Sequence, residues 1–98
     1  SKKTSGKIVV LSNGTDKVDL VGKIVLIKGA DPGYDWIFSK PIKGIITQYG
    51  GVGSHMAIRA AEFGIPAAIG CGEVLYNALV NANCVELDCG NYNIQIEH

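Results

Sequence analysis

The residue of this chain best suited to chemistry is His55, its only internal histidine. It follows the glycine-rich run "GGVGS" (residues 50–54) and stands where a helix is expected to begin. The first turn of a helix has unpaired backbone N–H groups and a positive potential, and glycines let an anion approach the backbone closely. A neutral imidazole at such a point keeps one nitrogen free to attack an electrophile. The pattern therefore suits a histidine that accepts a phosphoryl group.

The residues that could bind this phosphoryl group flank the histidine on both sides. Gly51 and Gly53 would form a slim approach, and Ser54 could cap the helix and hydrogen-bond the phosphoryl group. Arg59 lies one helical turn after His55 on the same face, within reach of a phosphoryl group. The alternatives are a simple tight turn for the glycines, and for Arg59 a solvated face on which it pairs with the glutamate three residues later.

Composition and charge exclude several classes of protein. The 98 residues are 47% hydrophobic and 18% charged, which fits one globular domain over residues 1–98, with residues 1–6 as a flexible start. Nine basic and nine acidic side chains balance without a basic stripe, and this argues against nucleic-acid binding. No apolar run is long enough for a membrane span and no signal peptide is evident, so we expect a cytoplasmic protein. The only methionine is Met56, so we expect a chain that was processed or cut from a larger protein.

Short apolar runs separated by turn residues predict a compact α/β domain. We expect three short helices, of which the first would have Asp31 as its N-cap and the second would stop at Gly64. The last two strands would pair like a hairpin. The predicted strands are residues 7–11, 23–28, 44–47, 67–70, 84–87 and 93–96, and the predicted helices lie within residues 30–40, 54–63 and 73–80.

The run "GGVGSHMAIRAAEFGIPAAIG" (residues 50–70) resembles the active-site signature of the phosphohistidine swivelling domain of phosphoenolpyruvate-utilising enzymes. This family includes pyruvate phosphate dikinase, phosphoenolpyruvate synthase and Enzyme I of the sugar phosphotransferase system. "KIVLIKGADPGY" and "VELDCGNYNIQI" are similar to further segments of the family, so the resemblance covers about residues 23–96.

The resemblance implies a phosphotransferase domain with a three-layer β/β/α fold. His55 would be phosphorylated in turn by each partner site as the domain swings between them. One partner would be an ATP-grasp nucleotide-binding domain, and the other a domain for phosphoenolpyruvate, pyruvate or another acceptor. The domain itself would bind no cofactor or metal, and we expect ATP and Mg²⁺ on the partner domains.

The chain departs from the family pattern at two positions. Gly53 stands where the family commonly has threonine, and Ala61 stands where it frequently has arginine. Arg59 lies two residues earlier, about 200° around the helix, and the departures leave a non-catalytic binding or regulatory module as the alternative. The remaining polar candidates have simpler interpretations: Asp31, Asp35 and Trp36 could contact a partner domain or be a helix cap and a core aromatic, and metal binding by His55 with Cys71 lacks evident further ligands.

Overall fold

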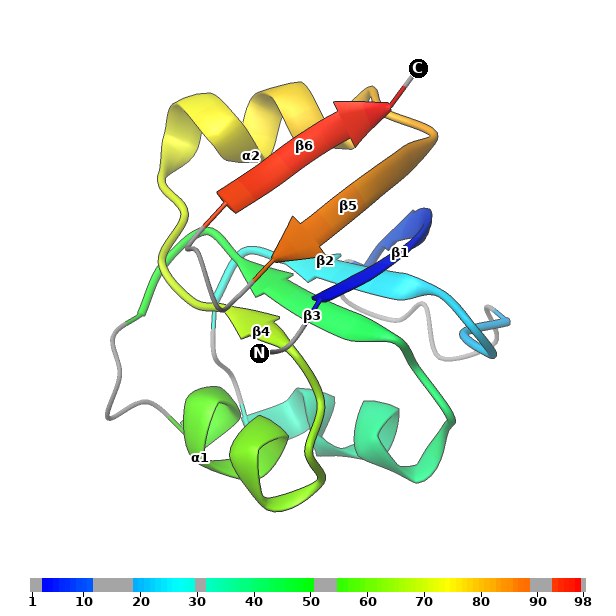
Figure 1. Ribbon diagram of the computed structural model, residues 1–98. Helices are drawn as coiled ribbons and strands as arrows, with labels where there is room; N and C mark the ends of the chain where they lie inside the picture. The colour runs from blue at the N-terminus through cyan, green and yellow to red at the C-terminus, as the bar shows by residue number, and fades with distance from the viewer. Residues whose placement is uncertain (1–2, 12–18, 30–31, 51–54, 89–92, 98) are drawn as a thin grey trace.

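The computed structural model describes residues 3–11, 19–29, 32–50, 55–88 and 93–97. Their strands form one six-stranded sheet in the order β4-β3-β2-β1-β5-β6 (Figure 1). Neighbours from β1 to β4 are parallel, whereas β5 is antiparallel to both β1 and β6. The elements are β1 (Lys3–Val10), β2 (Ile24–Ile27), the 3₁₀-helix η1 (Pro32–Ser39), β3 (Gly44–Thr47), α1 (His55–Glu62), β4 (Ala67–Ala68), α2 (Glu73–Val80), β5 (Cys84–Asp88) and β6 (Asn93–Glu97).

The two central strands are buried over their whole length, as their continuous apolar sequences require. All four residues of β2 and all four of β3 are buried, so both faces of the sheet are covered here. Because side chains alternate along a strand, Val25 and Ile27 enter one core while Ile24 and Leu26 enter the other. The parallel strands thus separate two hydrophobic cores.

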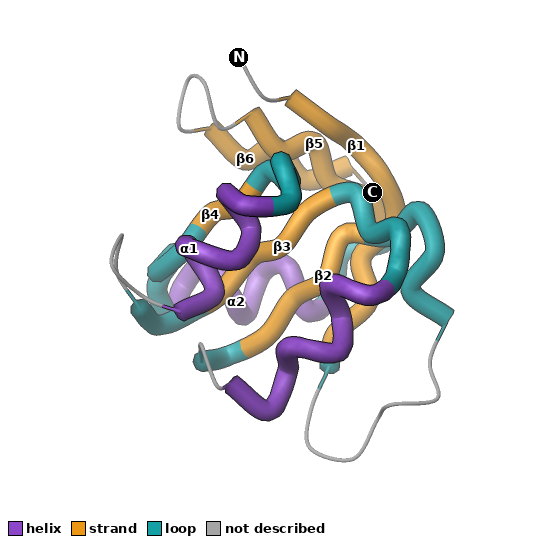
Figure 2. The backbone as a smooth tube through the Cα atoms, turned by 90° about the horizontal axis from the view of Figure 1, so that it is seen from below, coloured by secondary structure: helices purple, strands orange, loops and turns teal. Residues whose placement is uncertain are grey.

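The first core lies between the parallel strands and the helices η1 and α1. Ile37 and Phe38 of η1 pack there with Met56 and Ala60 of α1. Seen from below, α1 and η1 lie in front of the strands and α2 lies behind them (Figure 2). Met56 and Ala60 are four residues apart and form the apolar stripe of α1, so the opposite side of α1, including His55, remains exposed.

The second core lies on the opposite face, where the curled end of the sheet and α2 cover the parallel strands. Tyr76 and Leu79 of α2 pack there with Val85 and Leu87 of β5. The result is a helical layer, a layer of parallel strands, and a third layer made by β5, β6 and α2. This confirms the predicted compact α/β fold of the swivelling domain.

Two strand boundaries differ by two residues or more from the sequence predictions, and the other strand boundaries lie within one residue. The flexible start predicted for residues 1–6 is wrong for residues 3–6, because β1 begins at Lys3 and pairs there with Asp88 of β5. An ion pair of 3.1 Å between Lys3 Nζ and Glu86 Oε1 adds to this pairing. The strand predicted for residues 67–70 is only two residues long, since Gly70 adopts a left-handed φ of 77°. The predicted cap Asp31 lies outside the described residues.

Candidate functional site

The parallel arrangement of β2 and β3 brings two helix starts to one edge of the sheet. The chain leaves the carboxyl end of β2 toward η1, and it leaves the carboxyl end of β3 toward α1. Backbone bonds continue the ladder past the strands, since Tyr49 N donates to Lys28 O at 2.8 Å. In open α/β sheets, sites form at the carboxyl ends of the strands. Here, this edge carries Asp35 on η1 and His55 at the start of α1.

A short contact joins these two side chains. His55 Nε2 lies 2.7 Å from Asp35 Oδ1, and the side chains are 41% and 43% exposed. A carboxylate oxygen only accepts hydrogen bonds, so the proton of this contact lies on Nε2. The imidazole is therefore held in one orientation while it remains open to solvent.

Arg59 approaches the same carboxylate from the next turn of α1. Its Nε atom is 4.0 Å from Asp35 Oδ1, and its Nη1 donates to Glu62 Oε1 at 3.3 Å. The guanidinium also lies over two aromatic rings, with its carbon 5.0 Å from the centre of Phe63 and 5.9 Å from that of Phe38. These rings stack on each other at 5.5 Å with an interplanar angle of 8°. Packing thus fixes Arg59 beside Asp35.

The start of the loop that leads to His55 is fastened to the segment after β4. Thr47 Oγ1 accepts a hydrogen bond from Gly70 N at 3.0 Å and donates one to Tyr49 O at 2.8 Å. A Cβ atom on Gly70 would lie 2.5 Å from Gly50 O, so only glycine fits at this position. Gly70 closes the "GIPAAIG" run, and its structural role is to let these two loops approach each other.

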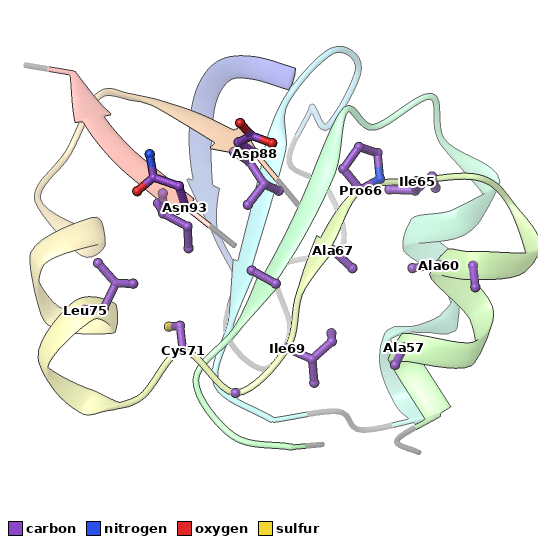
Figure 3. Close-up of a pocket in the computed structure, with 15 residues that line it drawn as sticks. Ala57, Ala60, Ile65, Pro66, Ala67, Ile69, Cys71, Leu75, Asp88 and Asn93 are labelled. Atoms are coloured by element: carbon purple, nitrogen blue, oxygen red, sulfur yellow. The ribbon is translucent and has the colours of Figure 1, made fainter. Parts of the chain in front are cut away.

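A groove of about 890 Å³ runs along β4 on the other side of α1. Figure 3 shows α1 on one side of it and α2 with the ends of β5 and β6 on the other. Ala61 lines this groove together with Ala57 and Cys71. Position 61 is therefore on the groove side of α1, whereas Arg59 faces Asp35.

Of the residues predicted for phosphate binding, only Arg59 lies in the described part of the chain. Arg59 and His55 both approach the carboxylate of Asp35. Arg59 also forms the expected ion pair with Glu62, three residues later. Gly51, Gly53 and Ser54 lie outside the described residues. The contribution of Asp35 was missed, because the sequence places it 20 residues before His55 with no local pattern that links the two.

Metal binding by His55 and Cys71 finds no support in the described residues, which contain no group of three or more potential metal ligands. Burial raises the pKa of the Cys71 thiol, so the neutral thiol is favoured over the thiolate that a metal requires.

No helix within the described ranges is long and apolar enough to cross a membrane.

Comparison with known proteins identifies the family of this chain. Residues 20–91 match the model of the mobile domain of PEP-utilising enzymes. The chain belongs to this family. The matched residues include Asp35, His55 and Arg59, together with the glycine-rich run, and the resemblance seen in the sequence is thereby confirmed.

Members of the PEP-utilising family with similar sequences are much longer proteins. The chain is 35% identical over 91 residues to phosphoenolpyruvate synthase of Neisseria meningitidis, a match covering 87% of this chain and 11% of that protein. It is 36% identical over 73 residues to phosphoenolpyruvate synthase of Escherichia coli (70% and 9%), and 37% identical over 65 residues to rifampicin phosphotransferase of Bacillus cereus (66% and 7%). The chain thus spans about a tenth of the length of these relatives.

Proposed function

We propose that this mobile domain is a phosphoryl carrier in which His55 is transiently phosphorylated. The observation that carries the proposal is the position of the imidazole, which is exposed at the first residue of α1 and at the carboxyl edge of the parallel strands. A helix start favours an anion, so a phosphorylated imidazole is stabilised there. We assign phosphate binding to Arg59 and to Gly51, Gly53 and Ser54, whose backbone and hydroxyl groups precede the helix.

The phosphoryl group would be received from one partner domain and delivered to another. The relatives are about nine to fourteen times longer than the matched segments, which supports further domains in the parent protein. We propose an ATP-grasp domain, which binds ATP and Mg²⁺, and an acceptor domain for phosphoenolpyruvate or pyruvate. The rifampicin phosphotransferase relatives support a more general role, in which the same carrier serves different acceptors. We place the protein in the cytoplasm, where these donors occur.

Exposed apolar side chains near His55 suit docking into partner clefts. Ile58, three residues after His55 on α1, is 54% exposed, and Tyr49, just before the glycine run, is 60% exposed. A few large side chains near the centre of an interface, tyrosine often among them, contribute most of its binding energy. These residues would therefore make the contacts that let His55 enter a partner's site.

The test is phosphorylation of the intact parent protein with γ- and β-labelled ATP, and separately with labelled phosphoenolpyruvate. We expect acid-labile, alkali-stable label on the wild type, loss of that label in His55→Ala, and retention in His98→Ala as the matched control. The label that transfers would also identify which phosphate of ATP is used. Absence of label from both donors, in a protein whose nucleotide domain binds ATP, would rule out the carrier function in favour of a non-catalytic module.

A further inference from the structure

The Asp35 carboxylate contacts the ring nitrogen of His55 that would have to reach into another domain's cleft. Nε2 is the nitrogen of His55 farther from the backbone, whereas Nδ1 lies next to Cβ and the first turn of α1. A group passed into another domain's cleft is best carried on the outer nitrogen. In the structure, that nitrogen is 2.7 Å from Asp35 Oδ1.

The same oxygen atom faces a second group that needs an anion. Arg59 Nε lies 4.0 Å from Asp35 Oδ1, is buried, and has no hydrogen-bond partner among the described residues. A buried donor without a partner costs free energy, and a charged donor costs more than a neutral one. Asp35 therefore lies where an anion can contact the imidazole of His55 and approach the guanidinium of Arg59. A phosphoryl group on Nε2 would bring its own oxygens to this place.

We propose that Asp35 is a positioning residue that stands in for the phosphoryl group. This inference rests on the proposed carrier function and refines it. In the unphosphorylated domain Asp35 holds the ring through Nε2, and on phosphorylation it gives up this contact to the phosphoryl oxygens, which then face the guanidinium of Arg59. Before the transfer, the Nε2 proton passes through Asp35 to solvent and Nδ1 takes up a proton from solvent, which leaves Nε2 with a lone pair in the ring plane. This lone pair then forms the N–P bond while the donor's P–O bond breaks and its electron pair leaves with the donor oxygen.

Displacement of a carboxylate makes the phosphohistidine easier to discharge. The charged side chains that the structure places around this contact are Asp35 from η1 and Arg59 and Glu62 from α1. A unit negative charge about 4 Å from the incoming phosphoryl group opposes its addition about fivefold even at the dielectric constant of water. The same repulsion favours its departure. Asp35 would thus keep the phosphoryl group from resting too stably on a domain that must pass it on.

The test uses the 98-residue chain and phosphoramidate, a phosphoryl donor that requires no partner domain. His98→Gln is introduced throughout, so that His55 is the only histidine. We expect Asp35→Asn to speed phosphorylation of His55 and to slow decay of the phosphohistidine, and the two factors multiplied together should be about fivefold or more. Asp35→Ala should act in the same direction. Glu73→Gln, which removes an exposed acidic side chain on α2, should change neither rate.

The direction of the change separates this role from a structural one. A residue that only maintained the fold, or that activated the imidazole, would give slower phosphorylation when removed. Equal or slower phosphorylation of folded Asp35→Asn, or no phosphorylation of either protein, would overturn the proposal. Ring ¹⁵N chemical shifts provide a second measurement, because the wild type should hold its proton on Nε2 and the phosphorylated form on Nδ1. Failure of the carrier function would be seen separately, in the ATP and phosphoenolpyruvate labelling of the parent protein.

Discussion

Replacing Gly70 with alanine tests whether the loop before His55 is fixed by the segment after β4. Gly70 has a φ of 77°, and an alanine in this left-handed region costs about 1–2 kcal/mol. Its Cβ would also lie 2.5 Å from Gly50 O, which is backbone and cannot rotate away. Forcing a backbone shift of this kind costs about a further 1–3 kcal/mol. We therefore expect Gly70→Ala to lower the free energy of unfolding by about 2–5 kcal/mol.

Gly22 provides a matched control for the conformational part of this cost. Its φ is 71°, close to that of Gly70, but a Cβ there meets no atom of the described residues within 4 Å. Gly22→Ala should therefore cost only about 1–2 kcal/mol. Urea unfolding followed by the fluorescence of Trp36, the only tryptophan, measures both. The difference between the two variants isolates the contact between Gly70 and Gly50.

Gly70→Ala also tests whether the loop contact affects phosphorylation of His55. A shift of Gly50 would move the glycine-rich run and with it the first turn of α1, so Gly70→Ala should slow phosphorylation of His55 by phosphoramidate, and Gly22→Ala should not. Suppose that Gly70→Ala and Gly22→Ala lost the same stability, and that His55 in both was phosphorylated by phosphoramidate at the wild-type rate. The loop contact would then not position the imidazole, and the reasoning would be refuted.

Three further measurements test other parts of the structure. Met56→Ala should cost about 2–5 kcal/mol in chemical denaturation, since Met56 is fully buried in the core under α1; a loss below about 1 kcal/mol would contradict that packing. Burial raises the pKa of Tyr76, so the stability this residue contributes is complete below its ordinary pKa of 10.0 and is lost as pH rises through the raised value. Tyr76→Phe should remove this loss of stability at alkaline pH. An unchanged profile of stability against pH would contradict the role of Tyr76. Burial also raises the pKa of Cys71. In a Cys84→Ser/Cys89→Ser background, alkylation of Cys71 at pH 8 should therefore be slower in the folded protein than in the protein unfolded by urea. Equal rates would show an accessible, ordinary thiol.

The sequence predicted those parts of the fold that depend on local patterns. The apolar runs of β2 and β3 are the buried centre of the sheet, and Gly64 ends α1 with a φ of 67°. The start of β1 was missed because "KTSG" is polar and includes a glycine, so only its pairing with β5 makes it a strand. The segment 30–40 was predicted as helical, but hydrophobic spacing over one or two turns does not distinguish a 3₁₀-helix from an α-helix.

The sequence predicted only those residues of the candidate site that lie close together in the chain. His55 and Arg59 are one turn apart, so helix geometry alone places them on one face. Asp35 reaches them because β2 and β3 are parallel neighbours, and a sequence carries no local sign of which strands pair. The partner of the imidazole was for this reason considered only as a helix cap or an interface residue.

The resemblance to the family predicts an arginine at position 61, where this chain has Ala61. Ala61 lines the groove along β4, while Arg59 lies on the side of α1 that faces η1. The two positions are about 200° apart around the helix, so one cannot substitute for the other in the same geometry. Arg59 is instead fixed from the other direction, by the stacked rings of Phe38 and Phe63. If His55 carries a phosphoryl group, as we propose, that group would meet Arg59 from the η1 side, next to Asp35, where Phe38 and Phe63 hold the guanidinium.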